Sequence, residues 1–466
     1  MTGEDEGTLV SSPTIAERLA AAVADLDVGR LPAELRHQFR RALLDYLAAT
    51  IAGAQSAVAR TVQDYFLSID PSQQSTLIGR QGRLSPPNAA FCNGTSAHAL
   101  ELDDGYTPGS VHPGAVVFSA VLPVAEALGL PLERVEVAVV AGFEVTLRLS
   151  RLMHPGSWAR GFHNTAVHGV FGAAAAVAKL LELPADRIAH AFGLAGSHAA
   201  GLFEFLGTGA EVKRLHPGKA ARDGIICAEL AARGITGPLT VFEGERGYFR
   251  AYSDRIGPVE QLFDGFGRRF EMMNIYVKPY PCCRHLHGPI DLVRRIKQQR
   301  QQLDPDSIER IEVATYEVAA RHRHRVVHDW LDAQMSIPWA VAVALLHDRL
   351  GVERFDPAAP DRDRIEALMA RVEVTVDPWC QEQYPAKRPA VLRIRTRDGR
   401  LLEERAEYPL GEPQTPLSDA DLELKLRTLA EPILGERQVS GLIEAVWGSA
   451  PLGQLLEQAA ASSPCW

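Results

Sequence analysis

Three predicted helices of this 466-residue chain begin directly after a basic side chain. His163 precedes Asn164-Thr165 and a run made largely of Ala and Gly, and His112 precedes Pro113-Gly114 and an apolar run. Lys213 belongs to a basic cluster that precedes a third run of small residues. Because a helix start exposes unpaired N–H groups and the positive end of the helix dipole, each of these points suits a bound carboxylate. The repetition indicates one acidic ligand.

Three carboxylates, Glu101, Asp103 and Asp104, lie at the predicted C-terminal end of another helix, where the dipole disfavours negative charge. Carboxylates in such a position are either exposed, as in a solvated acidic loop, or paired with a cation. Histidine supplies a pKa near neutrality, which a proton-transferring group needs. Carboxylates, histidines and lysines together therefore favour acid–base chemistry on an anion.

A fourth polar segment, residues 277–288, contains Lys278, Tyr280, Arg284 and His285 at a predicted domain boundary. A cleft between domains is a common location for a ligand. Each segment also has a plainer interpretation. His163 would be an incidental surface residue on a core helix, the basic cluster around Lys213 an exposed loop, and residues 277–288 a rigid linker with two prolines.

Several common sites have no support in this sequence. It contains no HExxH motif and no CxxC pair, and Arg321-His-Arg-His-Arg325 is interpreted as a basic surface edge because neighbouring cations oppose a metal ion. No Walker loop, no GxGxxG after a strand and no GxSxG elbow is present. We expect no metal and no nucleotide cofactor.

The composition is that of a soluble globular protein, with 46% hydrophobic and 23% charged residues. A net charge of −9 argues against a nucleic-acid partner. The acidic start of the chain lacks an apolar signal core, and the apolar run 115–130 is broken by Pro123 and contains Glu126, so we expect no membrane partner. The six scattered cysteines favour a reducing, cytoplasmic location.

Hydrophobic periodicity predicts a mainly α protein: a large all-α domain and a smaller α+β lid domain inserted before the closing helices. We expect domain segments 1–271, 272–408 and 409–466, with disorder over residues 1–12. Helices are predicted over 31–53, 85–102, 115–128, 132–150, 165–183, 185–200 and 219–232, with a short β-like edge at 75–79. In the lid we expect helices over 289–302, 339–350 and 362–371 and strands over 307–316, 372–376, 390–396 and 401–408. The closing helices, 420–434 and 439–446, are expected to return to the first domain.

Taken together, the polar segments resemble the MmgE/PrpD family, which includes 2-methylcitrate dehydratases, cis-aconitate decarboxylases and iminodisuccinate epimerases. The motifs that carry the resemblance are Asn93-Gly-Thr, Leu102-Asp-Asp, His112-Pro-Gly, Gly161-Phe-His, Lys213-Arg-Leu-His-Pro-Gly-Lys-Ala-Ala and Lys278-Pro-Tyr-Pro-Cys-Cys-Arg. The resemblance implies a helical domain with an α+β lid, a homodimer, a site between the domains, and activity without metal or organic cofactor. It places active-site residues at the acidic motif, His112, His163, Lys213 and Lys278.

One departure concerns the reaction type. Decarboxylase-like members tend to carry Asp at the position of Glu101 and Thr at the position of Gly105, so the decarboxylase interpretation is weakened. The hydroxyl of Thr107 is a possible substitute.

The resemblance implies a small di- or tricarboxylate substrate, and we therefore expect a cofactor-independent dehydratase acting on a hydroxy-di- or tricarboxylate such as citrate or 2-methylcitrate. In this hypothesis His163 is the base, His112 protonates the departing hydroxide, and Lys213 and Lys278 stabilise charge on the substrate. Asp103 or Glu101 orients a histidine or acts as the partner acid. Further substrate contacts are expected from Asp104, Arg160, His216, Tyr280, Arg284 and Tyr106.

Three alternatives use the same residues. A decarboxylase would protonate an allylic carbanion, and an epimerase would place a base and an acid on opposite faces of one carbon, such as a lysine with Tyr280 or Tyr106. A non-catalytic carboxylate-binding protein would keep the cations without needing the histidine base.

Overall fold

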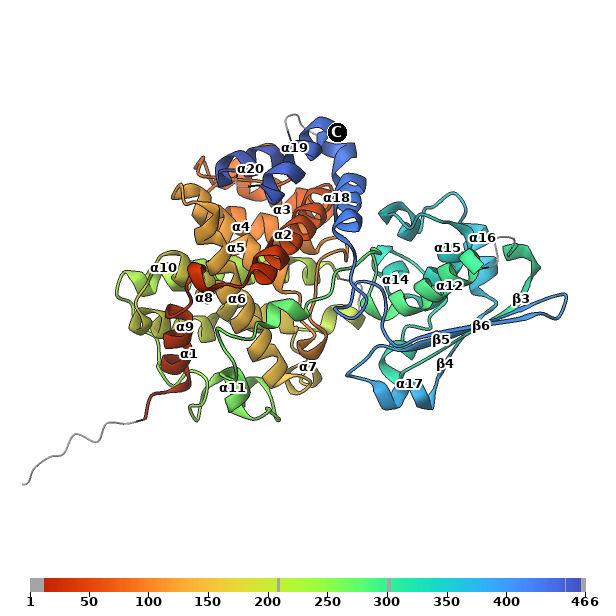
Figure 1. Ribbon diagram of the computed structural model, residues 1–466, viewed down its shortest axis with the longest axis horizontal. Coiled ribbons are helices and arrows are strands. Elements are labelled where there is room, and N and C mark those ends of the chain that lie inside the picture. The colour runs from red at the N-terminus through yellow and green to blue at the C-terminus, as the bar shows by residue number, and fades with distance from the viewer. Residues whose placement is uncertain (1–11, 208–209, 300–302, 449, 462–466) are drawn as a thin grey trace, which may run out of the picture.

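The computed structural model describes residues 12–207, 210–299, 303–448 and 450–461 and is mainly helical. A large body of helices lies beside a smaller body that contains a four-stranded sheet (Figure 1). Each body has its own hydrophobic core, which supports the proposed division into a helical domain and a lid. The helices of the first body are α1 (Ile15–Ala24), α2 (Ala33–Gly53), α3 (Ala57–Ile69), α4 (Pro86–His98), α5 (Pro113–Ala127), α6 (Leu132–Met153), α7 (Gly156–Ala159), α8 (Asn164–Leu180), α9 (Ala185–His198), α10 (Val212–Ala232) and α11 (Tyr248–Tyr252).

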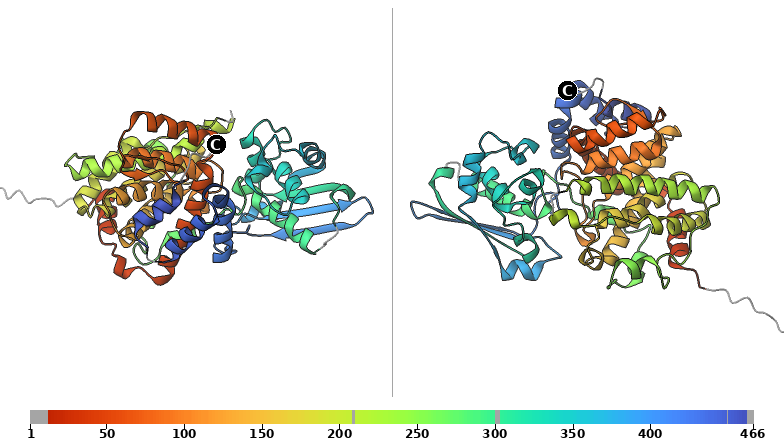
Figure 2. Two further views of the ribbon diagram at one scale, coloured as in Figure 1. Left: turned by 90° about the horizontal axis from the view of Figure 1, so that it is seen from above. Right: turned by 180° about the vertical axis from the view of Figure 1, so that it is seen from behind.

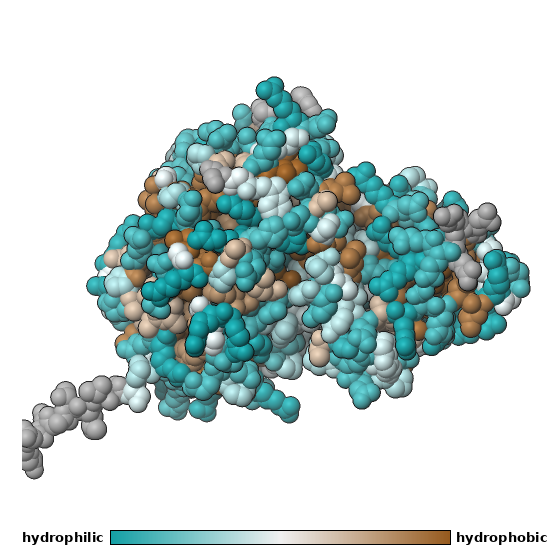
Figure 3. All heavy atoms as spheres, in the orientation of Figure 1, coloured by the Kyte–Doolittle hydropathy of each residue, from teal (hydrophilic) through white to brown (hydrophobic). Residues whose placement is uncertain are grey.

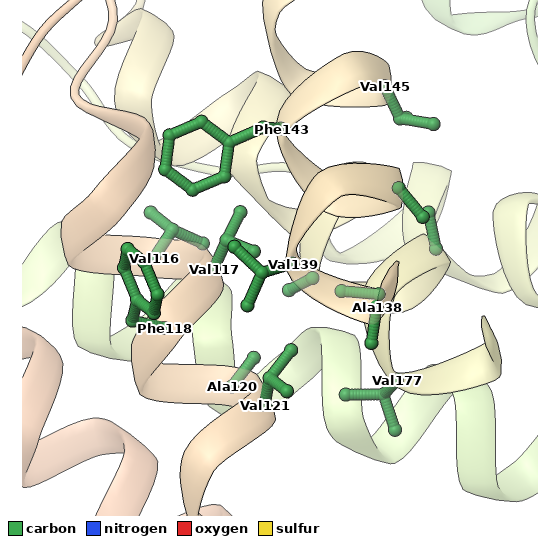
Figure 4. Close-up of a cluster of buried hydrophobic side chains, with 14 of the residues drawn as sticks. Val116, Val117, Phe118, Ala120, Val121, Ala138, Val139, Phe143, Val145 and Val177 are labelled. Carbon is green, nitrogen blue, oxygen red and sulfur yellow. The ribbon is translucent and has the colours of Figure 1, made fainter. Parts of the chain in front are cut away.

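Helix α8 lies at the centre of the helical domain, and α5, α6, α9 and α10 surround it. Its small residues are needed because the neighbouring backbones come very close. A Cβ atom at Gly172 would lie 1.8 Å from Oγ1 of Thr146 on α6, and one at Gly224 of α10 would lie 2.3 Å from Cβ of Ala173. Neighbouring helices therefore pack closely against this Ala-rich helix. Larger side chains fill the adjacent layer, where valines and phenylalanines of α5 and α6 interdigitate (Figure 4).

The lid sheet has the strand order β4-β3-β5-β6, with β3 parallel to β4 and antiparallel to β5. Helices α12, α15 and α16 lie on one face of the sheet and α17 lies on the other, as Figure 1 and Figure 2 show. Trp339 of α15 is fully buried in the lid core. The lid elements are α12 (His287–Gln299), β3 (Ile308–Thr315), α13 (Glu317–Ala320), α14 (Trp330–Met335), α15 (Ile337–Leu346), α16 (Arg362–Met369), β4 (Val372–Val376), α17 (Pro378–Gln383), β5 (Ala390–Thr396) and β6 (Leu401–Ala406). The predicted strands and the hairpin turn at Asp398-Gly399 are confirmed.

After the lid the chain forms α18 (Asp419–Leu434), α19 (Glu436–Trp447) and α20 (Leu452–Ala459). Helix α18 packs against α2, and Leu426 and Val439 join the core of the helical domain. Lys425 of α18 donates to Asp45 Oδ1 at 2.5 Å and to the carbonyl of Leu102 at 2.7 Å. The closing helices therefore hold the acidic segment that follows α4.

Two boundaries differ from the prediction where they matter for chemistry. Helix α10 begins at Val212 and includes Pro217, so Lys213 and His216 lie on the helix and not in a loop before it. Helix α4 ends at His98, because the backbone turns after it and Glu101 adopts a left-handed conformation with φ of 57°. Helices α3 and α20 were not predicted. Residues 1–11 of the segment predicted to be disordered lie outside the described residues, and so does Gln302, where a lid helix was predicted to end.

The β-like edge at 75–79 reduces to a two-stranded ladder, β1 (Ser75–Thr76) with β2 (Arg83–Leu84). The face of the molecule in Figure 3 is mostly hydrophilic, and its outline narrows between the two domains. Among the described residues no single helix is long and apolar enough to cross a membrane, and α2 with α3 meets the length and composition criteria only as a pair bent by 85°.

Candidate active site

Glu101 lies between two lysines that come from distant parts of the chain. Lys213 of α10 donates to Oε1, and Lys278, in the segment that enters the lid, donates to Oε2 at 3.2 Å. All three side chains are buried. Burial alone would raise the pKa of Glu101, but the two lysines hold this pKa well below its usual value. Glu101 is therefore ionised, and both lysines are held at one point of the site.

Asp103 connects the lysine pair to two histidines. Its Oδ2 accepts from His98 Nδ1 at 2.7 Å and lies 3.4 Å from His112 Nδ1, and its Oδ1 lies 3.7 Å from Lys278 Nζ. Burial opposes ionisation, yet His98, His112 and Lys278 lower the pKa of Asp103. This carboxylate is an orienting group, because it fixes the rings of histidines on either side of it.

His112 directly precedes α5, as predicted. Its Nδ1 donates to the carbonyl of Asp104 at 2.7 Å, and its backbone N–H donates to Thr165 Oγ1 of α8 at 3.2 Å. Since a carbonyl can only accept, the neutral ring carries its proton on Nδ1 and has its lone pair on Nε2. Burial lowers the pKa of His112 to about 3. The ring is thus a neutral imidazole with a free basic nitrogen.

Asp104 plays a structural part beside this ring. Its Oδ1 accepts the backbone N–H of Gly114 at 2.9 Å, and burial raises its pKa well above the usual value, with Asp45 and Asp103 adding to the effect. It stabilises the start of α5 and does not face a cation at hydrogen-bond distance in the described structure.

His163 directly precedes α8, also as predicted. Its Nδ1 lies 2.9 Å from Nδ1 of His216 on α10, and its ring contacts those of Phe203 and Phe205. Burial lowers the pKa of His163 well below its usual value and that of His216 to about 4. The two rings are therefore neutral, and one nitrogen of the pair donates to the other.

His98 is the residue of this cluster that we did not predict. It is fully buried, its ring centroid lies 5.0 Å from that of His112 and 5.9 Å from that of His163, and its Nε2 has no hydrogen-bond partner among the described residues. A signal was available, because His98 precedes Glu101 by one helical turn in the motif that carries the carboxylates. Like His112, His98 has an Nδ1 held by a hydrogen bond and an Nε2 that is available as a base.

The structure does not bring every predicted residue to this cluster. Arg160 pairs with Asp254 at 2.7 Å and is 40% exposed in its side chain, so it lies at the surface. Tyr280 donates to Asp291 at 2.7 Å inside the lid, and Tyr106 donates to Glu271 at 2.6 Å. These three hydroxyl or guanidinium groups already have partners away from the lysine pair.

Arg284 lies near the domain junction. Its Nε donates to Glu412 at 3.1 Å, its Nη1 donates to the carbonyl of Leu410, and its guanidinium lies over the ring of Tyr276, 4.6 Å from the centroid. Arg388, which we did not single out, donates to Thr107 Oγ1 of the helical domain at 3.2 Å. Thr107 therefore contacts the lid and is not a member of the lysine and histidine cluster.

Two groups in the described structure hold three atoms of metal-binding type within 4.8 Å of one another: His98, Asp103 and His112, and Cys283, His285 and His322. A fixed cation lies beside each group. Lys278 is 3.7 Å from Asp103, and Arg388 Nη1 is 3.1 Å from His285 Nδ1. Because a neighbouring cation opposes a metal ion, proton transfer suits these side chains better than metal binding.

A cavity of about 980 Å³ lies next to this cluster and not at it. Ala99 and Leu100, between His98 and Glu101, form part of its wall, together with Trp330 and Leu331 of the lid and Ile433 of α18. Its lining is mainly apolar, whereas the acid–base groups gather on the other side of this short segment. We place the candidate site at the polar cluster, since bases, acids and two lysines converge there.

Most of the chain is similar to known proteins. The model of the MmgE/PrpD N-terminal domain matches residues 17–260, and that of the MmgE/PrpD C-terminal domain matches residues 280–449. A human protein named cis-aconitate decarboxylase is 28% identical over 445 residues, which cover 93% of this chain and 91% of the relative. The Aspergillus terreus protein of that name is 26% identical over 448 residues, or 91% of each chain. A Cupriavidus necator protein named 2-methylcitrate dehydratase is 28% identical over 263 residues, 51% of each chain.

Proposed function

Because the chain belongs to the MmgE/PrpD family, we propose that it is a lyase that acts on a small polycarboxylate and removes water from a hydroxy-di- or tricarboxylate of the citrate type. The names of its relatives support a lyase with a substrate of this class. The observation that carries the proposal is the convergence of two lysines and three histidines around Glu101 and Asp103 in one buried cluster.

Lys213 and Lys278 are the groups that would bind the substrate carboxylate next to the carbon that loses a proton. Removal of that proton builds negative charge on the carboxylate, and two fixed ammonium groups stabilise it where it forms. Since both ammonium groups are buried, their effect on an anion is larger than in water. Glu101 holds them in place and would give way in part to the substrate.

His112 is the base in this proposal, which revises the expectation that His163 has this role. The hydrogen bond to Asp104 leaves a lone pair on Nε2, and Asp103 beside Nδ1 stabilises the imidazolium that forms after proton transfer. The low pKa of His112 rises when an anion approaches, so substrate binding itself makes the ring a stronger base.

His163 is the proton donor. We assign the shared proton of the pair to His216 Nδ1, which leaves the proton of His163 on Nε2. From there it would be given to the departing hydroxide while the shared proton moves from His216 Nδ1 to His163 Nδ1. His216 would take up a proton from water at its own Nε2, so that both rings end neutral. His98, with its free Nε2 between the two rings, is an additional base.

Decarboxylation is the second candidate, and a specific observation favours it. The relatives named cis-aconitate decarboxylase match over 91–93% of this chain, whereas the 2-methylcitrate dehydratase from Cupriavidus necator matches over 51%. In that reaction loss of CO2 would leave a carbanion stabilised by the lysines, and His163 would protonate it. We rank decarboxylation second because decarboxylase-like family members tend to carry Asp and Thr where this chain has Glu101 and Gly105.

The deciding experiment incubates the purified protein, with and without a chelator, in deuterated water with citrate-, aconitate- and aspartate-type acids and follows products by mass spectrometry. Loss of water supports the proposal, release of CO2 supports decarboxylation, and deuterium uptake without net product supports epimerisation. The His112→Asn variant is the control for contaminating enzymes. Turnover that disappears with the chelator would contradict cofactor independence, and unchanged acids throughout would favour a carboxylate-binding protein.

A further inference from the structure

Cys283 differs from the other described cysteines in its surroundings. Cys92, Cys227, Cys282 and Cys380 are buried, and burial raises the pKa of each. Cys283 is partly exposed, and although burial of its sulfur acts in the same direction, His322 lowers the thiol pKa to about 7. One thiol in the described chain is thus held in the state that reacts with electrophiles.

The geometry around this sulfur resembles that of an activated nucleophile. The sulfur of Cys283 and one ring nitrogen each of His285 and His322 lie within 4.8 Å of one another. The side chain of His322 and the backbone of His285 both interact with the thiol, and the backbone of Met335 interacts with the His322 ring and so helps to orient it. A nucleophile, a base and a group that orients the base make up the triad arrangement of covalent catalysis.

Cys283 also lies close to the proposed substrate cluster. It precedes α12 and follows Lys278 by five residues, and its charge interacts with those of Lys278 and Glu101, while that of His322 interacts with Lys213. Besides these groups, Tyr316 of the lid and the adjacent Cys282 face it. The positive charges of these two lysines favour an anionic reagent.

We propose that the partly exposed Cys283 and His322 form a thiolate–imidazolium pair at the start of the lid, and that this pair is a site of covalent modification by small carboxylic acids with an electrophilic carbon. The preference for carboxylic acids rests on the proposed function, whereas the reactivity of the thiol does not. None of the roles assigned above to the lysines and the other histidines requires this pair.

The chemistry needs no further reactant. With an α,β-unsaturated acid the sulfur adds to the β-carbon, the π-electron pair moves to the α-carbon, and that carbon takes the proton from His322, so a thioether forms without oxidation or reduction. With iodoacetate the sulfur bonds to the methylene carbon and iodide leaves with its electron pair. Acids of the first kind are the products expected of a dehydratase, so the site would also respond to product.

The test compares iodoacetate with the neutral iodoacetamide at pH 7, with labelling located by peptide mass spectrometry. A Cys465→Ser background is used because Cys465 lies outside the described residues, and buried Cys282 in the same peptide is the internal control. We expect labelling of Cys283 but not Cys282, about tenfold faster with iodoacetate. With thiolate pKa values of about 7 and about 8.5, the His322→Asn variant should react with iodoacetamide about fifteenfold more slowly at pH 7 and equally fast at pH 10.

Each other outcome overturns a stated part. No labelling of Cys283 would refute the activated thiol, and a His322→Asn variant as fast as wild type at pH 7 would refute the pairing. If His322→Asn still reacted slowly at pH 10, the substitution would have blocked access of the reagent to Cys283 and not changed the ionisation of its thiol. The pH profile of the wild-type protein tests the same point if the variant does not fold, because its labelling rate should reach half of its maximum near pH 7. Equal rates for the two reagents would refute the carboxylate preference, and labelling as expected in a protein that converts no acid would refute the proposed function alone.

Discussion

Replacing Glu101 by Gln tests whether the lysine pair is a carboxylate site. The substitution keeps the shape of the side chain but leaves Lys213 and Lys278 buried with only Asp103 nearby, 3.7 Å from Lys278. Removing one partner of a buried ion pair costs about 3–5 kcal/mol. At about 2 °C per kcal/mol for a large domain, the thermal midpoint should fall by roughly 6–10 °C.

A bound tricarboxylate should restore this loss, because one of its carboxylates takes the place of the missing charge. Citrate is therefore expected to raise the unfolding midpoint of Glu101→Gln by several degrees more than that of the wild-type protein. The assay is thermal unfolding followed by fluorescence, with sodium chloride at matched ionic strength to remove general screening effects.

Glu144→Gln is the matched control. Glu144 is equally buried and pairs with Arg148 at 2.9 Å within α6, away from the cluster. Burial raises the pKa of Glu144 to about 7, so this variant should lose less stability than Glu101→Gln, and it should show no extra gain from citrate. If citrate raised the midpoints of both variants equally, or neither, the lysine pair would not be a carboxylate site and the reasoning above would fail.

Three further predictions concern single residues. His112→Asn should lower kcat by about 10²–10⁴-fold in the product assay, because it removes the proposed base. The surface variant Arg160→Ala should keep full activity, and an equal loss in both variants would show that His112 is not the base. Burial lowers the pKa of His112 to about 3, from about 6.5 in the unfolded chain. The neutral ring therefore contributes stability above pH 6.5 that is lost as the pH falls toward 3. Over this window the thermal midpoint of His112→Asn should decline less steeply than that of the wild-type protein. Gly105→Thr should destabilise by about 1–3 kcal/mol in urea unfolding, because a Cβ atom there lies 2.3 Å from Cζ and Oη of Tyr276. The same substitution made in a Tyr276→Ala background should cost much less relative to Tyr276→Ala alone, because the clashing ring is gone.

Much of the fold was predictable because its signals are local. Amphipathic periodicity located most helices, alternation located the lid strands, and the residues before α5 and α8 were identified from their Pro-Gly and Asn-Thr starts. The family resemblance, confirmed over both domains, depended on short motifs of the same kind. These features need no knowledge of which distant segments meet.

The pairings within the site could not be predicted in that way. Glu101 meets Lys213 across 112 positions and Lys278 across 177, and such partners are set by how α4, α10 and the lid segment pack. His98 was overlooked because it lies on a helix that seemed an ordinary core element, and the partner of Cys283 is 39 positions away on another lid segment. Arg160 was selected for its position next to His163, but the backbone turn there directs it to Asp254 at the surface.

The charges of the cluster suggest how one set of residues can serve both binding and catalysis. Lys213 and Lys278 carry two positive charges and Glu101 and Asp103 two negative ones, while burial keeps His112 and His163 neutral. The net charge of these four groups is therefore zero. A bound polycarboxylate makes the net charge of the cluster negative, even though the lysines contact it. The least costly response is to protonate the histidines, whose pKa values rise beside an anion. On this argument the substrate recruits the protons that its own conversion requires, and a neutral analogue of the same shape would bind without activating the site.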